Sequence, residues 1–253
     1  MSQIVIVTGG SRGIGAATAR LLGHEKASVV VNYRNAKAEA DAVVRDIAAS
    51  GGSAIAIQGD VGSEDDILRL FAETDRAFGT LTGLVNNAGI TGGTKRRIET
   101  LTFAGIMETM RVNVAGQLLC AREAVKRMST RHGGKGGAIV NVSSLAATLG
   151  GRSGSSAYAA TKGAVDSFTK GFAREVASEG IRVNSVRPGM VLSEMTEKRL
   201  AEPAFRQSIE ASIPMHRVGT PGEIADAVLY LLSDEASFIT GAMLDAAGGG
   251  YII

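Results

Sequence analysis

Short apolar runs rich in β-branched residues alternate along this chain with longer stretches in which apolar residues recur every three or four positions. The first pattern predicts buried strands and the second predicts amphipathic helices. The apolar runs cover residues 4–7, 29–31, 54–57, 84–85, 138–142, 181–186 and 242–244, and the helical stretches cover residues 14–22, 36–49, 64–78, 109–128, 159–177 and 221–232. Strands that are apolar on both faces, separated by helices, indicate an α/β protein with a Rossmann fold. We expect a doubly wound parallel sheet of about seven strands with helices on both faces.

No proline-rich or Gly/Ser-rich linker divides the chain, and no internal repeat stands out, so we expect one domain over residues 1–253. In such folds ligands bind outside the carboxyl ends of the strands. Five segments that could contact a ligand follow predicted strands, at residues 9–15, 60–61, 86–89, 143–144 and 188–189. They are therefore expected to converge on one crevice.

A glycine-rich loop follows the first predicted strand. Its spacing, Gly9-x-x-x-Gly13-x-Gly15, differs from the common G-x-G-x-x-G fingerprint, but the mechanism is the same. Glycine permits a tight turn and a close approach of a pyrophosphate to a helix N-terminus. The alternative is a strand-to-helix turn without a ligand. The candidate cofactor-binding residues of this loop are Gly9, Ser11, Arg12, Gly13, Ile14 and Gly15.

Two arginines indicate which dinucleotide this loop would bind. Arg12 lies inside the loop, and Arg34 ends the second strand pattern, with no acidic residue between positions 29 and 38. An NAD site usually carries an acid there for the ribose hydroxyls, whereas an NADP site carries cations. The pattern therefore favours NADP(H), the alternative being that both arginines are solvated on the surface.

Tyr158 and Lys162 are spaced i, i+4, which places both side chains on one helix face. A nearby ammonium favours the phenolate, and an oxidised nicotinamide would add a further positive charge, so we expect Tyr158 to be a base with a pKa nearer neutrality. Ser143 and Ser144 end the preceding strand. The alternative is a structural tyrosine beside a solvated lysine. Asn86-Asn87-Ala88-Gly89 has a structural alternative too, as a turn, although its small residues would let a flat ring lie against the backbone.

Composition excludes several classes of partner. The formal net charge is +2, with no basic run longer than Lys95-Arg96-Arg97, which gives no electrostatic case for nucleic acid or for a membrane surface. We see no signal peptide and no apolar stretch of the ~18 residues that span a bilayer. The single cysteine, Cys120, excludes an intramolecular disulfide and fits a reducing compartment. These features predict a soluble, cytoplasmic protein.

Other chemistries lack their motifs. None of the three histidines, His24, His132 and His216, lies in a ligand-spaced cluster, so no metal site is expected. A serine hydrolase would need a G-x-S-x-G elbow, which the segment 151–155 lacks.

Taken together, the motifs resemble those of the short-chain dehydrogenase/reductase family, over residues 4–249. TGGSRGIG (8–15), GDV (59–61), NNAG (86–89), VNV (112–114), VNVSS (140–144), YAATK (158–162), RPG (187–189) and FITG (238–241) occur in family order. Within the family, the chain resembles the branch of 3-oxoacyl-carrier-protein reductases and glucose dehydrogenases.

The resemblance implies roles for individual residues. Tyr158 would be the general acid in reduction and the base in oxidation. Lys162 would hold the nicotinamide ribose and lower the Tyr158 pKa, Ser144 would hydrogen-bond the substrate oxygen, and Asn113 would hold a water in a proton relay. The implied cofactor contacts are Asp60 at the adenine, Asn86 at the adenosine ribose, Ile90 and Val191 at the nicotinamide, and Val61, Ala88, Gly89, Tyr158, Lys162, Pro188, Gly189 and Ser193.

The chain departs from the family pattern in three places. Ser144 precedes Tyr158 by fourteen residues rather than the usual thirteen, which keeps Ser143 as a lesser candidate. Ser193 replaces the usual threonine and keeps its hydroxyl. Glu179 stands where carrier-protein reductases carry a basic residue, which argues against an acyl-carrier-protein substrate, although Lys135 and residues 95–97 could supply positive charge.

We therefore expect an NADP(H)-dependent oxidoreductase for a small carbonyl compound or its secondary alcohol. The alternatives are a 3-oxoacyl-carrier-protein reductase and a catalytically idle NADP(H)-binding sensor or scaffold. By resemblance, helices at about 100–130 and 156–178 would pair between subunits of a homodimer or homotetramer. Residues 190–215 are expected to form a helical substrate lid, whose apolar residues are Met195, Leu200, Phe205, Ile209 and Met215.

Overall fold

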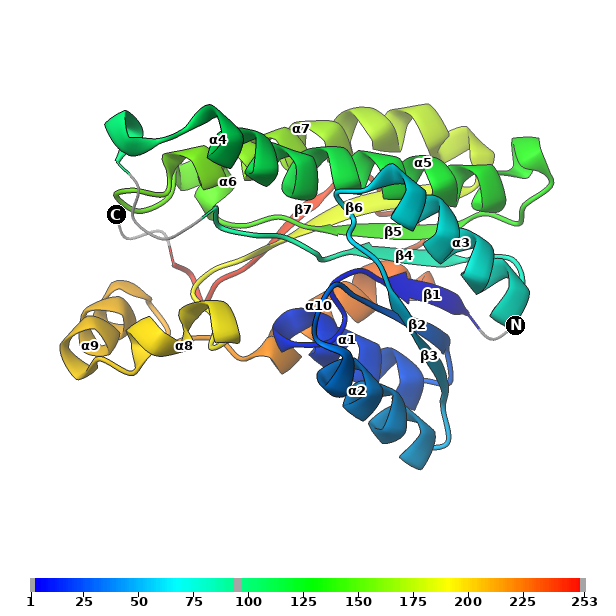
Figure 1. Cartoon of the computed structure of the whole chain (residues 1–253), viewed down its shortest axis with the longest axis horizontal. Coiled ribbons are helices and arrows are strands. Elements are labelled where there is room, and N and C mark those ends of the chain that lie inside the picture. Colours follow the sequence, from blue (N-terminus) through cyan, green and yellow to red (C-terminus); the bar gives the residue numbers. More distant parts are fainter. Residues whose placement is uncertain (1–2, 93–96, 251–253) are drawn as a thin grey trace.

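The computed structural model describes residues 3–92 and 97–250, without the side chains of Glu194 and Met195. Within these residues seven parallel strands form one sheet, in the order β3-β2-β1-β4-β5-β6-β7 (Figure 1). The strands are β1 (Ile4–Val7), β2 (Ser28–Tyr33), β3 (Ser53–Gln58), β4 (Gly83–Asn86), β5 (Gly137–Val142), β6 (Ile181–Pro188) and β7 (Met243–Ala246). The predicted α/β fold with a parallel sheet is confirmed.

Helices cover both faces of this sheet, with α1, α2 and α10 on one side and α3, α5 and α7 on the other (Figure 1). The helices are α1 (Gly13–His24), α2 (Lys37–Ala49), α3 (Glu64–Phe78), α4 (Phe103–Met110), α5 (Gly116–Met128), α6 (Ala146–Leu149), α7 (Ser156–Val176), α8 (Glu194–Leu200), α9 (Pro203–Ser212) and α10 (Pro221–Leu232). Short helical turns are η1 (Ile98–Thr100), η2 (Arg111–Ala115), η3 (Thr130–His132), η4 (Ala177–Glu179) and η5 (Asp234–Ala236).

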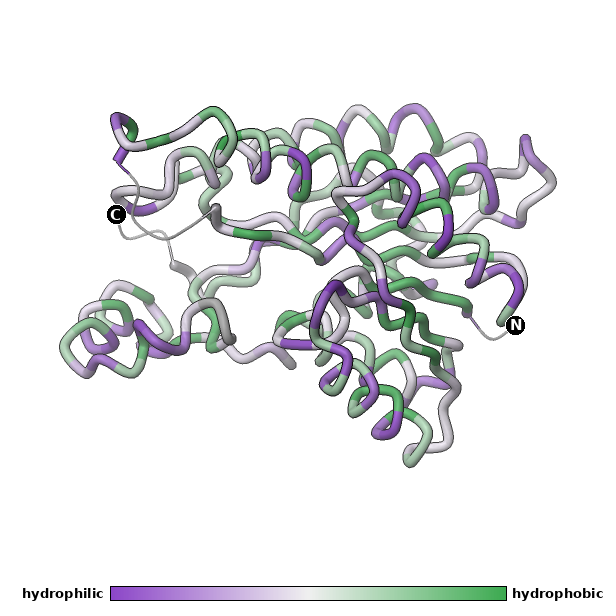
Figure 2. Tube along the Cα trace, viewed as in Figure 1, coloured by the Kyte–Doolittle hydropathy of each residue, from purple (hydrophilic) through white to green (hydrophobic). Residues whose placement is uncertain are grey.

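The strands are apolar throughout because each one contributes to two cores. In β1, Val5 and Val7 pack among residues of α1, α2 and α10, whereas Ile6 between them packs among residues of α3, α5 and α7. All three are fully buried. Alternate residues of a strand thus pack into the cores on the two sides of the sheet. In Figure 2 the tube is coloured hydrophobic along much of β1 and its neighbouring strands.

The direction in which the chain winds reverses between β1 and β4, which are neighbours although β2 and β3 lie between them in sequence. The loops after β1 and β4 therefore begin side by side. Ligands of open parallel sheets bind at such a switch point.

The stretch predicted as one helix over 109–128 is longer and interrupted. It begins with α4 at Phe103, passes through η2, a π-helical turn, and continues as α5. π turns in helices often occur at functional sites. Here the turn contains Asn113, which is fully buried.

The predicted lid forms two short helices, α8 and α9. Leu200 and Ile209 are buried in a small separate core, with Phe205 packed against it. Met215 lies beyond α9 and is 58% exposed, so it does not belong to this core. Of the other residues named from sequence, the side chain of Met195 and the residues Lys95 and Arg96 lie outside the described part of the chain. In the described residues, no helix is both long enough and apolar enough to cross a membrane.

Candidate active site

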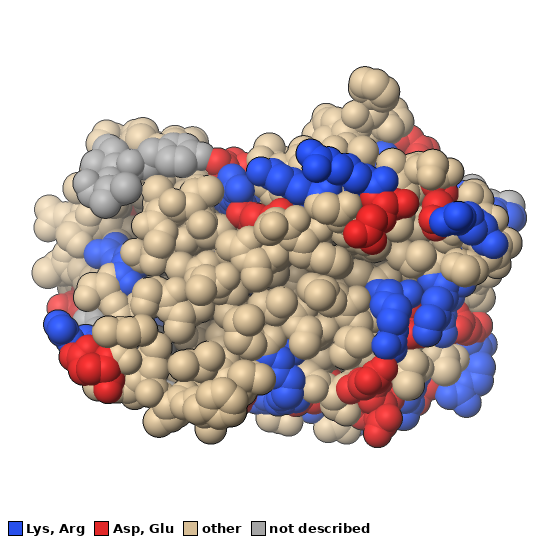
Figure 3. All heavy atoms as spheres, turned by 90° about the horizontal axis from the view of Figure 1, so that it is seen from above, with Lys and Arg blue, Asp and Glu red and all other residues tan. Residues whose placement is uncertain are grey.

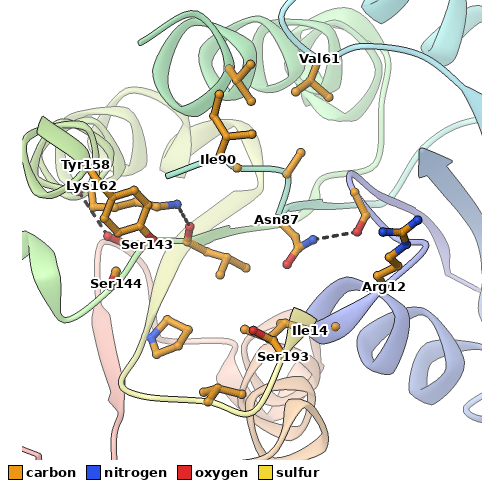
Figure 4. Close-up of a pocket in the computed structure, with 18 of the residues that line it drawn as sticks. Arg12, Ile14, Val61, Asn87, Ile90, Ser143, Ser144, Tyr158, Lys162 and Ser193 are labelled. Carbon is orange, nitrogen blue, oxygen red and sulfur yellow. Dashed lines mark hydrogen bonds between the residues drawn. The ribbon is translucent and has the colours of Figure 1, made fainter. Parts of the chain in front are cut away.

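A cavity of about 390 Å³ opens at the carboxyl ends of the strands, at the switch point. It collects residues from every motif that follows a strand, as the sequence predicts. Figure 4 shows Arg12 at one end, Asn87 in the middle, and Tyr158, Lys162 and Ser144 at the other end. The predicted site residues that line it are Gly9, Arg12, Gly13, Ile14, Arg34, Asp60, Val61, Ala88, Gly89, Ile90, Ser144, Tyr158, Lys162, Pro188, Gly189, Val191 and Ser193, together with the lesser candidate Ser143.

The loop after β1 exposes the backbone of two glycines to this cavity, beside the side chains of Arg12 and Ile14. Gly9 and Gly13 have φ values of +61° and +52°, a conformation that glycine adopts without strain. Helix α1 begins at Gly13, has no acidic residue in its first turn and has no side chain capping its N-terminus. Its first N–H groups therefore remain available to an anion, which is the arrangement that binds a pyrophosphate.

Two predicted residues of this loop, Ser11 and Gly15, do not line the cavity. Gly15 is buried, and a Cβ atom there would lie 2.3 Å from the carbonyl oxygen of Gly9. Its role is therefore to let α1 pack closely against the loop. It supports the cavity without forming its surface.

Hydrogen bonds of Asn87, rather than of Asn86, connect the loop after β4 to the loop after β1. The Asn87 side chain donates hydrogen bonds to the carbonyl oxygens of Thr8 (2.9 Å) and Gly9 (3.1 Å). The Thr8 hydroxyl in turn accepts from the backbone N–H groups of Asn87 and Ala88. Two loops of the cavity therefore hold one shape.

Asn86 is not placed as the sequence suggests. Its side chain is 1% exposed and donates to Asn141 Oδ1 (3.0 Å) and to the backbone oxygen of Gln117. It ends β4 inside the sheet and does not line the cavity. Asn87, the first residue after β4, lines the cavity instead, so Asn86 does not lie where the predicted ribose contact requires and Asn87 does.

The two arginines at the end of the cavity differ in their surroundings. Arg12 forms an ion pair with Glu39 in the first turn of α2, at 2.7 Å. Glu39 lies one position beyond the segment that the sequence shows to be free of acids. Arg34 is exposed, lines the cavity and has no ion pair among the described residues.

Asp60 lies at the same end and is held rigidly. Its carboxylate accepts from the N–H of Gly62 at 2.8 Å and from Arg111 at 3.3 Å. Its own N–H donates to Asp66 at 2.9 Å. The adjacent Val61 is 7% exposed and belongs to the core around α3 and α5. These contacts hold in place the part of the cavity wall that the loop after β3 forms.

Tyr158 and Lys162 lie on the first turns of α7, as their spacing predicts. Lys162 is 3% exposed, donates from Nζ to the carbonyl oxygen of Val142 at 2.8 Å, and places Nζ 5.7 Å from the centre of the Tyr158 ring. Ser143 is buried and donates to the Lys162 carbonyl oxygen. Ser144 accepts from the N–H of Ala146, which leaves its hydroxyl hydrogen for another partner.

The geometry thus favours Ser144 over Ser143 as the serine that acts together with Tyr158. Ser144 hydrogen-bonds the Tyr158 side chain, whereas the Ser143 hydroxyl is committed to the backbone. The fourteen-residue spacing is accommodated by α6 and the glycine-rich turns that follow it, where Gly150, Gly151 and Gly154 have positive φ values.

Burial governs the titration of both groups. It lowers the pKa of Lys162 to about 8, against a smaller opposite effect of Asp166. Burial raises the pKa of Tyr158 above its ordinary value, and the Ser144 hydrogen bond opposes this. The sequence suggests the opposite direction for Tyr158. The difference arises because the loss of water around the phenol outweighs the hydrogen bond from Ser144.

Asn113 does not line the cavity, and its side chain is fully used inside the protein. Its Oδ1 accepts from the N–H of Ile90, and its Nδ2 donates to the carbonyl oxygen of Ile90, both at 2.8 Å. Nδ2 also donates to Thr161 at 3.0 Å. Its side chain therefore positions Ile90, a residue of the cavity wall, rather than reaching a ligand.

A second cavity, of about 670 Å³, adjoins the first beneath α8 and α9. Ser144, Tyr158, Pro188, Gly189 and Thr196 line both cavities. The hydroxyl-bearing residues therefore form a junction between a cavity bounded by the glycine loop and a wider one bounded by the lid helices. Ser193 begins α8, and its hydroxyl contacts that of Thr196 at 3.3 Å.

Sequence reasoning missed three polar residues of the cavity. Asn32 lines the cavity while its side chain holds the N–H of Gly9 and the carbonyl oxygen of Gly59. Asn87 and Thr196 are the others. A polar residue inside a strand of β-branched residues was the signal for Asn32, and Asn87 lay inside a motif that the sequence did single out. Thr196 had no comparable signal.

Comparison with known proteins places the whole chain among oxidoreductases. Residues 9–251 match the family model described as enoyl-(acyl carrier protein) reductase. The chain is 47% identical to the uncharacterized oxidoreductase YgfF of Escherichia coli, over 97% of this chain and 99% of that protein. It is 39% identical to a 3-oxoacyl-[acyl-carrier-protein] reductase of Synechocystis, over 98% of this chain and 96% of that one.

A solved structure supports the same grouping. A double mutant of a short-chain dehydrogenase/reductase from Serratia marcescens superposes with a TM-score of 0.89 at 33% identity, covering 98% of this chain and 97% of that chain. The fold, the glycine loop and the tyrosine–lysine helix define a nicotinamide-dependent oxidoreductase that acts on CH–OH and C=O groups. The chain belongs to the short-chain dehydrogenase/reductase family.

Proposed function

We propose that this protein is an NADP(H)-dependent reductase of a small carbonyl compound, acting reversibly on the corresponding secondary alcohol, and that residues 1–253 form one cofactor-binding domain. The observation that carries the proposal is the junction at Ser144 and Tyr158. There a proton donor and a hydrogen-bond donor face both the cavity of the glycine loop and the wider cavity under the lid.

The residues present fit a dinucleotide. The uncapped start of α1 suits a pyrophosphate, and Arg34 suits the 2′-phosphate that distinguishes NADP from NAD. Gly89 leaves room above the lysine, since a Cβ atom there would lie 3.6 Å from Lys162 Nζ. Pro188, Gly189 and Val191 would border the nicotinamide. When bound, the reduced nicotinamide supplies the two electrons and the hydrogen that the carbonyl carbon takes up.

The chain supplies the proton and holds the substrate oxygen. Ser144 donates its hydroxyl hydrogen to the carbonyl oxygen and polarises the bond. Tyr158 gives the phenolic proton to the same oxygen as the alcohol forms, and takes it back in the oxidative direction. A raised Tyr158 pKa keeps the phenol protonated at neutral pH, which suits reduction. Lys162 faces the ring and stabilises negative charge that remains after the transfer.

A second candidate, a 3-oxoacyl-carrier-protein reductase, is favoured by the name of the Synechocystis relative. Glu179 weighs against it. Glu179 is 7% exposed, and its carboxylate accepts hydrogen bonds from Ser129 and Arg131. This position therefore presents no positive charge to an acidic carrier. Thioesters of small acyl groups remain within the proposed substrate class.

We also propose that the protein assembles as a homodimer or homotetramer, in the cytoplasm. Large apolar side chains lie exposed on α4 and α5, in Phe103 (78%), Met107 (47%) and Leu118 (37%) among others. The face in Figure 3 shows positive and negative side chains next to one another, with a wide area free of charge between them. An exposed apolar face of this kind fits an interface between subunits. A mass from light scattering equal to that of one chain would refute the assembly.

The test of the catalytic proposal follows NADPH oxidation at 340 nm with ketones, diketones and 3-oxoacyl thioesters. Tyr158→Phe removes the transferable proton and keeps the ring. We expect this variant to bind NADPH with wild-type affinity and to lose turnover by a factor of at least ~100, the usual contribution of a positioned acid. Normal turnover in Tyr158→Phe would show that the proton comes from elsewhere. NADPH binding without turnover of any substrate by the wild type would favour an idle sensor.

A further inference from the structure

Two positive charges line the second cavity, and none of its lining residues is acidic. Arg152 belongs to the glycine-rich turn between α6 and α7, and Arg199 belongs to the last turn of α8. Neither forms an ion pair among the described residues. Arg199 is only partly exposed, and burial of an unpaired charge is unfavourable unless a ligand compensates it.

Both guanidinium groups lie over one aromatic ring on α9. The Cζ atom of Arg199 is 4.4 Å from the centre of the Phe205 ring, and that of Arg152 is 5.2 Å away. Contact with a ring face attracts the cation and orients it, while the N–H donors stay in the plane of the guanidinium and remain available. Phe205 thus brings two sets of donors, from separate segments, to the same part of the cavity.

The neighbouring arginines provide the contrast. On the same helix as Phe205, Arg206 pairs with Glu210 at 2.9 Å, and beyond it Arg217 pairs with Glu223. Neither of these paired arginines lines the cavity. Among the described residues, carboxylates therefore neutralise these two arginines outside the cavity, whereas Arg152 and Arg199, which line it, have no such partner. Such a pair binds carboxylate or phosphate well, because guanidinium groups match both geometrically.

We propose that the substrate carries an anionic group, a carboxylate or a phosphate, which Arg152 and Arg199 bind while its carbonyl lies at Ser144 and Tyr158. This inference rests on the proposed carbonyl reduction and narrows its substrate class. The alternative is that the two arginines only stack on Phe205 and stiffen the lid. The proposal and this alternative differ in whether the arginines distinguish charged from neutral substrates.

The experiment uses pairs of substrates that differ only in charge. Acetoacetyl phosphopantetheine is compared with acetoacetyl pantetheine for phosphate, and 4-oxopentanoate with its methyl ester for carboxylate. The measured quantity is the ratio of kcat/KM within each pair. We expect the wild type to prefer the anionic member of at least one pair by ~10- to 100-fold, the effect of charge-assisted hydrogen bonds. The pair that responds identifies the anion.

In the double variant Arg152→Gln/Arg199→Gln, this ratio is expected to fall toward one. The matched control is Arg206→Gln, which removes a lid arginine outside the cavity and should leave both the ratio and the turnover unchanged. Turnover without preference for either anion, or a preference that survives in the double variant, would overturn the inference and leave carbonyl reduction intact.

A binding measurement tests the anion site independently of the proposed carbonyl reduction. Calorimetry follows 4-hydroxypentanoate and 3-hydroxybutyryl phosphopantetheine binding to the NADPH-loaded enzyme, which needs no turnover. Binding that is lost in the double variant but kept in Arg206→Gln supports the anion site even if no substrate in the panel is reduced. Equal binding to the wild type and the double variant would contradict it.

Discussion

The side chain of Asn113 offers the sharpest quantitative test of how this site is held together. In Asn113→Ala three hydrogen bonds disappear: two with the backbone of Ile90 and one with Thr161. Asn113 is 0% exposed, so water does not replace them. At about 1 kcal/mol for each bond, with a further penalty for the buried groups left unpaired, we expect a loss of about 3–5 kcal/mol in the free energy of unfolding.

Urea unfolding of the wild type and the variant at one protein concentration measures this loss, which also corresponds to a fall in melting temperature of about 6–20 °C for a chain of this size. NADPH affinity should fall as well, because Ile90 lines the cavity. The matched control is Asn86→Ala, another buried asparagine whose side chain donates two longer bonds away from the cavity. It should lower stability less and leave NADPH affinity unchanged. An Asn113→Ala protein as stable as the wild type would refute the reasoning.

Three further predictions concern charge and protons. In Arg34→Ala, NADPH affinity should fall ~10-fold or more while NADH affinity changes little; equal losses for both cofactors in fluorescence titrations would remove Arg34 from the 2′-phosphate. Since the folded pKa of Lys162 is about 8, below its ordinary 10.5, the cost of burying its charge is present below pH 8 and disappears toward pH 10.5. The stability of the wild type relative to Lys162→Met should therefore rise by about 2 kcal/mol from pH 7 to pH 10, and a flat difference would exclude a charged, buried lysine. In Ser144→Ala, loss of the hydrogen bond that lowers the Tyr158 pKa should move the alkaline rise of alcohol oxidation to higher pH; an unshifted profile would show that Ser144 does not contact the phenol.

The local pattern of apolar residues was sufficient to predict the sheet and most of the residues that line the cavity. Each strand is apolar on both faces because both faces are covered, so β1 and its neighbours were recognisable from their own residues. The position of a motif directly after a strand then placed it at the carboxyl edge. The course of the long helix was less predictable, because the π turn contains Asn113, whose partner Ile90 lies twenty-three residues away in sequence.

Side-chain direction and partners were beyond sequence reasoning. Whether Asn86 or Asn87 faces the cavity depends on where β4 stops. The pairing of Arg12 with Glu39 depends on how α2 begins beside the glycine loop. The direction of the Tyr158 pKa shift depends on the depth of its burial. The pairing of Arg152 and Arg199 over Phe205 joins three segments that no motif connects.

The π turn between α4 and α5 determines where this chain tolerates changes in length. A regular helix advances by about 100° for each residue, so removing one residue from η2 would turn α4 by that angle relative to α5. Asn113 would leave Ile90, and the apolar side chains of α4 would take a new direction. The turn after α6 is different, because it is a loop with positive-φ glycines, in which an added residue does not rotate one helix against another. It already accommodates the fourteen-residue spacing between Ser144 and Tyr158. We therefore expect natural insertions and deletions among relatives to gather near residues 150–154 and to be absent from residues 111–115.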